Sequence, residues 1–166
     1  MDWEELLAAP GGEEIAEKGP PGGVDMLTHA EVSAELAEGD RSSTEILQQR
    51  ELTEEAWLKA TVFWMTRLAQ DATEKGARAT LPLVYSEAFT KHQDSLKALP
   101  AMRPAEWAAL TVEMQQGDAS RALAKRNLSQ ADFARLNRHF AKLLPKDPLA
   151  NDEFLKAYGA LQDSGE

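Results

Sequence analysis

The chain has 166 residues, of which 43% are hydrophobic and 28% charged, and it carries a formal net charge of −10. This composition is typical of a folded globular protein and argues against a disordered chain. The absence of cysteine excludes disulfides, thiolate metal sites and cysteine nucleophiles, and no apolar run is long enough to span a membrane.

The negative charge is concentrated in the first third of the chain. Residues 1–58 contain 15 acidic and three basic residues, whereas residues 59–166 contain 13 acidic and 15 basic residues. A negative field of this kind opposes nucleic acid and anionic lipid and attracts basic surfaces, and it also favours solubility. The acidic N-terminus does not have the basic region of a signal peptide, so we expect a cytoplasmic protein.

Residues 1–25 differ from the rest of the sequence because they are rich in proline and glycine. Such residues interrupt helices, which predicts a flexible N-terminal arm. Before them, Trp3, Leu6 and Leu7 have the spacing i, i+3 and i+4, so a short helix would place all three on one face. We expect this face to dock on a surface, either of the same chain or of a partner, because so short a helix is not stable alone.

Helix signals dominate from Met26 onward, and residues 26–100 are predicted to hold four helices. Thr28 with Glu31 has capping-box spacing and Gly39 is a stop, and a second box at Ser42 opens a short helix to about residue 50. Thr53 caps a long third helix to about residue 75, and Pro82 begins a fourth that ends near Leu99.

A similar order of signals recurs in residues 101–166. Pro104 opens a helix that ends at Gly117, and Asp118 caps a short one. Ser129 caps a third helix that stops before Pro145, and Pro148 opens a last helix to about residue 161. No convincing strand is present.

Two short segments of the first half reappear in the second. RELTEEAW, residues 50–57, matches RNLSQADF at an offset of 76, and ELAEGD, residues 35–40, matches EMQQGD at an offset of 78. In the same alignment Trp57 matches Phe133 and Trp64 matches Phe140, and all four are predicted core residues. We therefore expect an all-α protein of two similar four-helix units, residues 26–100 and 101–166, packed together and preceded by the arm.

The pattern Leu-Thr-x-x-x-Trp followed by Trp-x-x-Arg-Leu occupies Leu52 to Leu68, and Leu128 to Leu143 has a related pattern. It resembles a helical repeat of bacterial proteins found near contractile (type VI-like) secretion components. The resemblance covers about residues 26–162 and departs at Arg-Glu-Leu, where the repeat has His-Gly-Leu. The resemblance implies a secretion-associated role and no catalytic residues.

No residue pattern indicates catalysis, a cofactor or a metal. The three histidines, His29, His92 and His139, have no second histidine at the spacing that binds metal on a helix. There is also no phosphate-binding loop and no serine nucleophile motif. We therefore expect a protein that is not an enzyme and that needs no cofactor.

Basic residues gather in residues 119–146: Arg121, Lys125, Arg126, Arg135, Arg138, Lys142 and Lys146. Of these, Arg126, Arg135 and Arg138 are candidate partner-binding residues. The other candidates are Trp3, Leu6 and Leu7 of the arm. Two helices joined by a tight turn suggest a helix-turn-helix, so a DNA-binding regulator is the alternative function. The acidic first half of the chain counts against nucleic acid.

The favoured function is binding of another protein without catalysis. Following the resemblance, we expect an adaptor or chaperone for a bacterial secreted effector, or an immunity protein against one. The negative field suits a basic effector or toxin, because complementary charge raises the rate of association. The sequence leaves the oligomeric state open.

Overall fold

The computed structural model describes residues 23–117 and 119–163, and all of its regular secondary structure there is helical, which confirms the predicted all-α class. Trp3, Leu6, Leu7 and the arm lie outside the described residues, as does the predicted cap Asp118. The chain divides into two compact units between Lys97 and Ala98, three residues before the predicted boundary. No helix among the described residues has both the length and the apolar character to cross a membrane.

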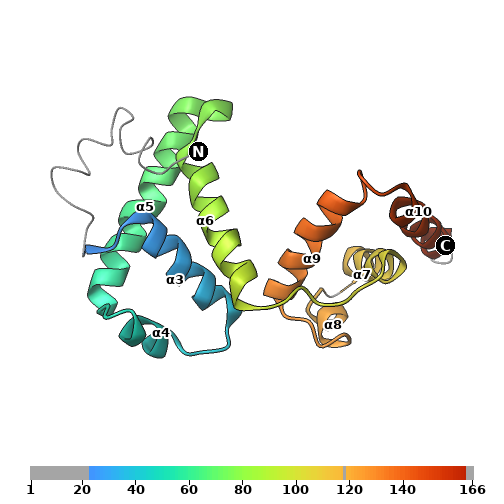
Figure 1. Cartoon of the computed structure of the whole chain (residues 1–166), viewed down its shortest axis with the longest axis horizontal. Helices are drawn as coiled ribbons and strands as arrows, with labels where there is room; N and C mark the ends of the chain where they lie inside the picture. The colour runs from blue at the N-terminus through green and yellow to red at the C-terminus, as the bar shows by residue number, and fades with distance from the viewer. Residues whose placement is uncertain (1–22, 118, 164–166) are drawn as a thin grey trace. The chain divides into compact units, whose positions relative to one another are not determined.

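The first unit contains α3 (Met26–Glu38), α4 (Ser43–Gln49), α5 (Glu54–Lys75), the 3₁₀ helix η2 (Gly76–Arg78) and α6 (Leu81–Leu96). Within this unit α3 packs mainly against α6, and α5 also contacts α6 (Figure 1). The cap of α3 differs from the prediction: the side chain of Asp25 accepts a hydrogen bond of 2.7 Å from the Thr28 N–H. Both Asp25 and Thr28 are residue types that favour the N-cap position. The sequence spacing alone therefore did not show which of the two caps the helix.

The turn between α5 and α6 is held by one buried carboxylate. Asp71 accepts hydrogen bonds from the N–H groups of Thr80 and Leu81, at 2.9 and 3.0 Å, and forms an ion pair of 2.6 Å with Lys75. These bonds satisfy the first donors of α6, which therefore begins at Leu81, one residue before the predicted start. The helix ends at Leu96, three residues before the predicted end.

The second unit contains α7 (Pro104–Gln116), α8 (Ala119–Ala124), α9 (Gln130–Leu143) and α10 (Pro148–Asp163), close to the predicted limits. Here α7 packs mainly against α10 (Figure 1). Trp107, 6% exposed, stacks on Phe140 with ring centroids 5.2 Å apart and an angle of 9° between the ring planes. This pair forms the centre of the core, together with Leu110, Ala122, Leu123 and Leu136.

The four aromatic residues predicted as core lie in or against the cores of their units. Trp64 and Phe140 are 2% and 1% exposed, whereas Trp57 and Phe133 are partly buried and pack against the core. The indole N–H of Trp64 donates to the carbonyl of Val24 at 2.9 Å. This bond ties the start of the described chain to the middle of α5.

The turn between the short and the long helix has the same hydrogen bonds in both units. The N–H of Leu52 donates to the carbonyl of Leu47 at 2.9 Å, and the N–H of Leu128 donates to Leu123 at 3.1 Å. The residue before each of these leucines has a positive φ, 55° at Glu51 and 52° at Asn127. The long helix then begins with a hydroxyl cap, Thr53 in α5 and Ser129 in α9.

Candidate functional site

The predicted basic surface is only partly open to solvent. Arg126 donates to Glu113 at 2.7 Å and to the carbonyl of Ala122 at 3.1 Å, so its guanidinium joins α7 to α8. Arg135 is 3% exposed and donates to Asp132 at 3.0 Å. Arg138 is half-buried on α9. Arg126 and Arg135 therefore bond within the second unit, and the role of all three arginines in partner binding stays a prediction.

The first unit has a comparable ion pair with more partners. Glu35 of α3 is 7% exposed and forms an ion pair with Arg50. It also accepts from Arg41 at 2.6 Å and lies 3.1 Å from Nε2 of His92. Burial opposes ionisation of this carboxyl, but hydrogen bonds from Arg50 and His92 and the Arg50 charge outweigh it, so the pKa of Glu35 is lower than its ordinary value.

The two ion pairs explain why two separate motifs recur together. Arg50 begins RELTEEAW and Glu35 begins ELAEGD, while Arg126 and Glu113 begin the matching segments of the second half. In each unit the arginine of one motif pairs with the glutamate of the other. The recurrence at the two offsets therefore corresponds to one contact made in each unit.

A second polar cluster is buried between α3, α5 and α6. His29 is 1% exposed, and its ring stacks on Trp57 at 4.5 Å between centroids. Its Nδ1 lies 3.0 Å from the hydroxyl oxygen of Tyr85, and its Nε2 lies 3.1 Å from Oγ1 of Thr61. The hydroxyl oxygens of Tyr85 and Ser33 lie 3.0 Å apart, which extends the chain of polar groups along α3.

Both hydroxyl groups beside the His29 ring donate their hydrogens elsewhere. Thr61 donates to the carbonyl of Trp57 at 2.9 Å, and Tyr85 donates to Oγ of Ser33 at 3.0 Å. Each of these oxygens can therefore accept a hydrogen from the ring nitrogen beside it. A neutral ring carries a hydrogen on one nitrogen only, so it donates to one of the two oxygens at a time.

Burial lowers the pKa of His29 to about 4, because the charged ring would lose its hydration. The ring is therefore neutral at pH 7. Because it is 1% exposed and its two nitrogens are engaged, it cannot reach a substrate in this conformation. We assign it a structural role that depends on pH. The lone histidine of α3 gave no sequence signal for this cluster, since Tyr85 lies 56 residues away.

Acidic side chains gather at the corner between α4 and α5. All three members are exposed, and we call them the acidic corner: Glu51, Glu54 and Glu55. Lys59 pairs with Glu55 at 2.6 Å, and both side chains are well exposed, so this pair is weak. The corresponding positions of the second unit, 76 residues on, include Asn127, Gln130 and Ala131. Only the first unit is therefore strongly acidic at this corner.

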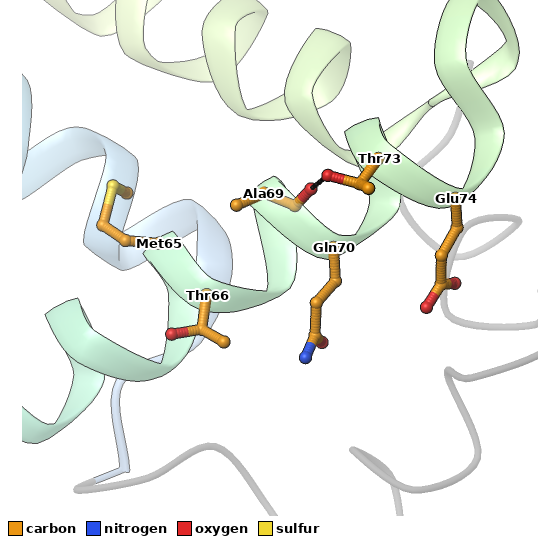
Figure 2. A pocket seen from close by; sticks show the side chains of 6 residues that line it. All are labelled: Met65, Thr66, Ala69, Gln70, Thr73 and Glu74. Carbon is orange, nitrogen blue, oxygen red and sulfur yellow. Dashed lines mark hydrogen bonds between the residues drawn. The ribbon is translucent and has the colours of Figure 1, made fainter.

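The outward face of α5 is apolar, a feature that our sequence analysis did not identify. Leu58, Val62 and Met65 are 61%, 68% and 42% exposed. A shallow hollow follows along the helix from Met65 to Glu74 (Figure 2). Its Thr73 donates its hydroxyl hydrogen to the carbonyl of Ala69 at 2.8 Å, within the same helix. The spacing of 58, 62 and 65 could have revealed a second apolar face on this helix.

The described residues contain no group of three or more histidine, cysteine, aspartate or glutamate side chains placed to hold a metal ion.

Comparisons with descriptions of protein families, with curated proteins and with solved structures find no match to this chain.

Proposed function

We propose that this protein acts without catalysis, by binding another protein that presents a basic surface. The observation that carries the proposal is the acidic corner, where exposed carboxylates lie in the turn before α5 and in the first turn of that helix. Lys59 is the one cation paired with it in the described structure, through Glu55. Such a surface speeds association with a basic partner and weakens as salt screens the charges.

The resemblance to the secretion-associated repeat supports a role beside a bacterial secretion system. The protein is an adaptor or chaperone for a bacterial secreted effector, or an immunity protein against one, and it works in the cytoplasm. The net charge of −10 favours a basic effector, such as a nuclease toxin, as the partner. Trp3, Leu6 and Leu7 remain additional predicted contacts with that partner.

We also propose that the two units are copies of one four-helix module. The repeated turn, the repeated hydroxyl cap and the repeated arginine–glutamate pair support this proposal. A stack of His29 on Trp57 in the first unit has a counterpart in Trp107 and Phe133, 5.4 Å apart in the second. In this view the copies diverged in charge, and the first became the acidic binding copy.

The test exchanges acidic residues for those of the second unit. The double variant Glu51→Asn, Glu55→Ala removes two exposed charges, and asparagine tolerates the positive φ at residue 51. We expect affinity capture from an extract of the source cells, followed by mass spectrometry, to recover a basic protein with the wild type. The double variant should recover much less of it.

A matched control places the same loss of charge elsewhere. Glu74 and Glu87 are exposed residues of α5 and α6 outside the acidic corner, so Glu74→Gln, Glu87→Gln should capture as much as the wild type. Equal capture by all three chains, or a captured partner without a basic surface, would refute the proposal.

A further inference from the structure

The exposed apolar face of α5 has the spacing of a helix-pairing seam. Its members are separated by four, three, four and three residues, and we call them the α5 stripe: Leu58, Val62, Met65, Ala69 and Ala72. All five side chains are exposed, whereas Trp64 of the same helix is buried in the unit's core. Alternation of three and four keeps a seam along one side of a helix for its whole length.

The stripe is graded in size along the helix, with its large side chains at one end. Leu58 and Val62 lie towards the start of α5, Met65 lies at the centre, and Ala69 and Ala72 lie towards the end. In a parallel pair the large side chains of the two copies would face each other at one end of the helix and the alanines would face each other at the other end. The seam would then be crowded at one end and loosely packed at the other. In an antiparallel pair, large side chains meet small ones and the seam fills evenly.

The antiparallel register follows from the residue numbers. With Met65 on the twofold axis, Leu58 lies opposite Ala72 of the second copy, and Val62 lies within one residue of Ala69 along the seam. The same register brings Glu54, in the first turn of α5, near Lys75 in the last turn of the second copy. A twofold axis repeats every contact, so the pair has opposite charges at both ends.

Threonines beside the stripe do not oppose the contact. Thr66 and Thr73 donate their hydroxyl hydrogens to the carbonyls of Val62 and Ala69, at 2.7 and 2.8 Å. Because these hydroxyls are satisfied within the helix, they need no water when a second helix covers them.

We propose that the α5 stripe binds the α5 stripe of a second copy of this chain, antiparallel and with Met65 on the twofold axis. The inference does not depend on the proposed function, because only Glu54 is common to the stripe's contacts and the acidic corner. A single helix pair forms a small interface, so we expect a dissociation constant on the order of 10 μM. The net charge of −10 on each copy opposes association, so added salt should tighten the dimer.

Sedimentation equilibrium of the full chain over about 1 to 500 μM tests this directly. We expect a monomer–dimer equilibrium for the wild type, and a dissociation constant raised at least about 100-fold by Met65→Lys, which places two like charges on the axis. Leu83→Lys is the matched control, since Leu83 is 65% exposed on α6 and should leave the dimer unchanged. Circular dichroism should show equal helix content in all three chains.

Crosslinking tests the direction of the pair, because the chain contains no cysteine. Under oxidation Met65→Cys should form a disulfide-linked dimer. A mixture of Leu58→Cys and Ala72→Cys chains should crosslink to each other, and neither should crosslink efficiently alone. Strong self-crosslinking of Leu58→Cys would indicate a parallel pair and overturn the proposed register.

Three results would overturn the proposal as a whole. The first is a wild type that remains monomeric over the full concentration range. The second is a dimer that Met65→Lys does not weaken. The third is a chain that dimerises through Met65 only after residues 1–22 are removed, because the N-terminal residues would then be the occupant of the stripe.

Discussion

The buried imidazole of His29 should make the stability of the first unit depend on pH. Its pKa is about 4 in the folded chain and about 6.5 when exposed. Between these values the unfolded chain holds a proton that the folded chain does not, so the free energy of unfolding falls as pH falls. The loss begins near pH 6.5, is complete near pH 4, and amounts to about 3 kcal/mol at 1.36 kcal/mol per pKa unit.

Urea unfolding of the wild type and of His29→Gln, at several pH values from about 7.5 to 4, measures this contribution. Carboxylates with lowered pKa values, such as Glu35, also destabilise the fold in acid, so the wild type alone is not diagnostic. The difference between the two proteins isolates the histidine. We expect the variant to be less stable at pH 7.5, because it loses the stack on Trp57, and the gap to narrow towards pH 4.

A gap that stays constant over this pH range would refute the reasoning, because it would mean that His29 titrates equally in both states. The two units can unfold separately, so each transition must be assigned. Trp57 and Trp64 report on the first unit and Trp107 on the second. The pH-dependent difference should appear only in the transition of the first unit.

Four further outcomes are expected. In urea titrations Trp64→Ala should lower the free energy of unfolding by roughly 3–5 kcal/mol, because the Trp64 side chain is 2% exposed. Leu58 is 61% exposed, so Leu58→Ala should change the free energy of unfolding by less than about 0.5 kcal/mol. Arg50→Ala should cost about 2 kcal/mol, because it removes one partner from the buried carboxylate of Glu35, and Arg50→Lys should restore part of it. Gly39→Ala should cost about 1 kcal/mol, because φ is 71° there. Fluorescence anisotropy should show no tight binding to generic duplex DNA at physiological salt, given the net charge of −10.

Local sequence signals predicted the helices well, because a cap and a stop act within a few residues. The capping box at Ser42 forms as its spacing indicates, and Ser129 caps α9 as predicted. The start of α6 depends on Asp71, which lies in the preceding helix, so the prediction missed it by one residue. The helix also ends three residues before the predicted end.

The candidate sites were less predictable, since they depend on contacts between distant residues. Helix α5 has two apolar faces, and the sequence does not say which one the rest of the unit buries. In the folded unit Val24 packs against Trp64, so the face of α5 that carries Trp64 is buried. The face that carries Val62 remains exposed. In the same way, a basic stretch predicts a charged surface, but Arg135 becomes buried through packing within its own unit.

The short sequence separation of the repeated ion pairs has a consequence for synthesis on the ribosome. Arg50 reaches back 15 residues to Glu35, and Arg126 reaches back 13 residues to Glu113. Helical structures with such local contacts fold within microseconds to milliseconds. Translation at about 5–20 residues per second needs several seconds for residues 98–166. We therefore expect the first unit to finish folding while the second is still being made, so that similar segments of the two halves seldom compete for the same partner helices.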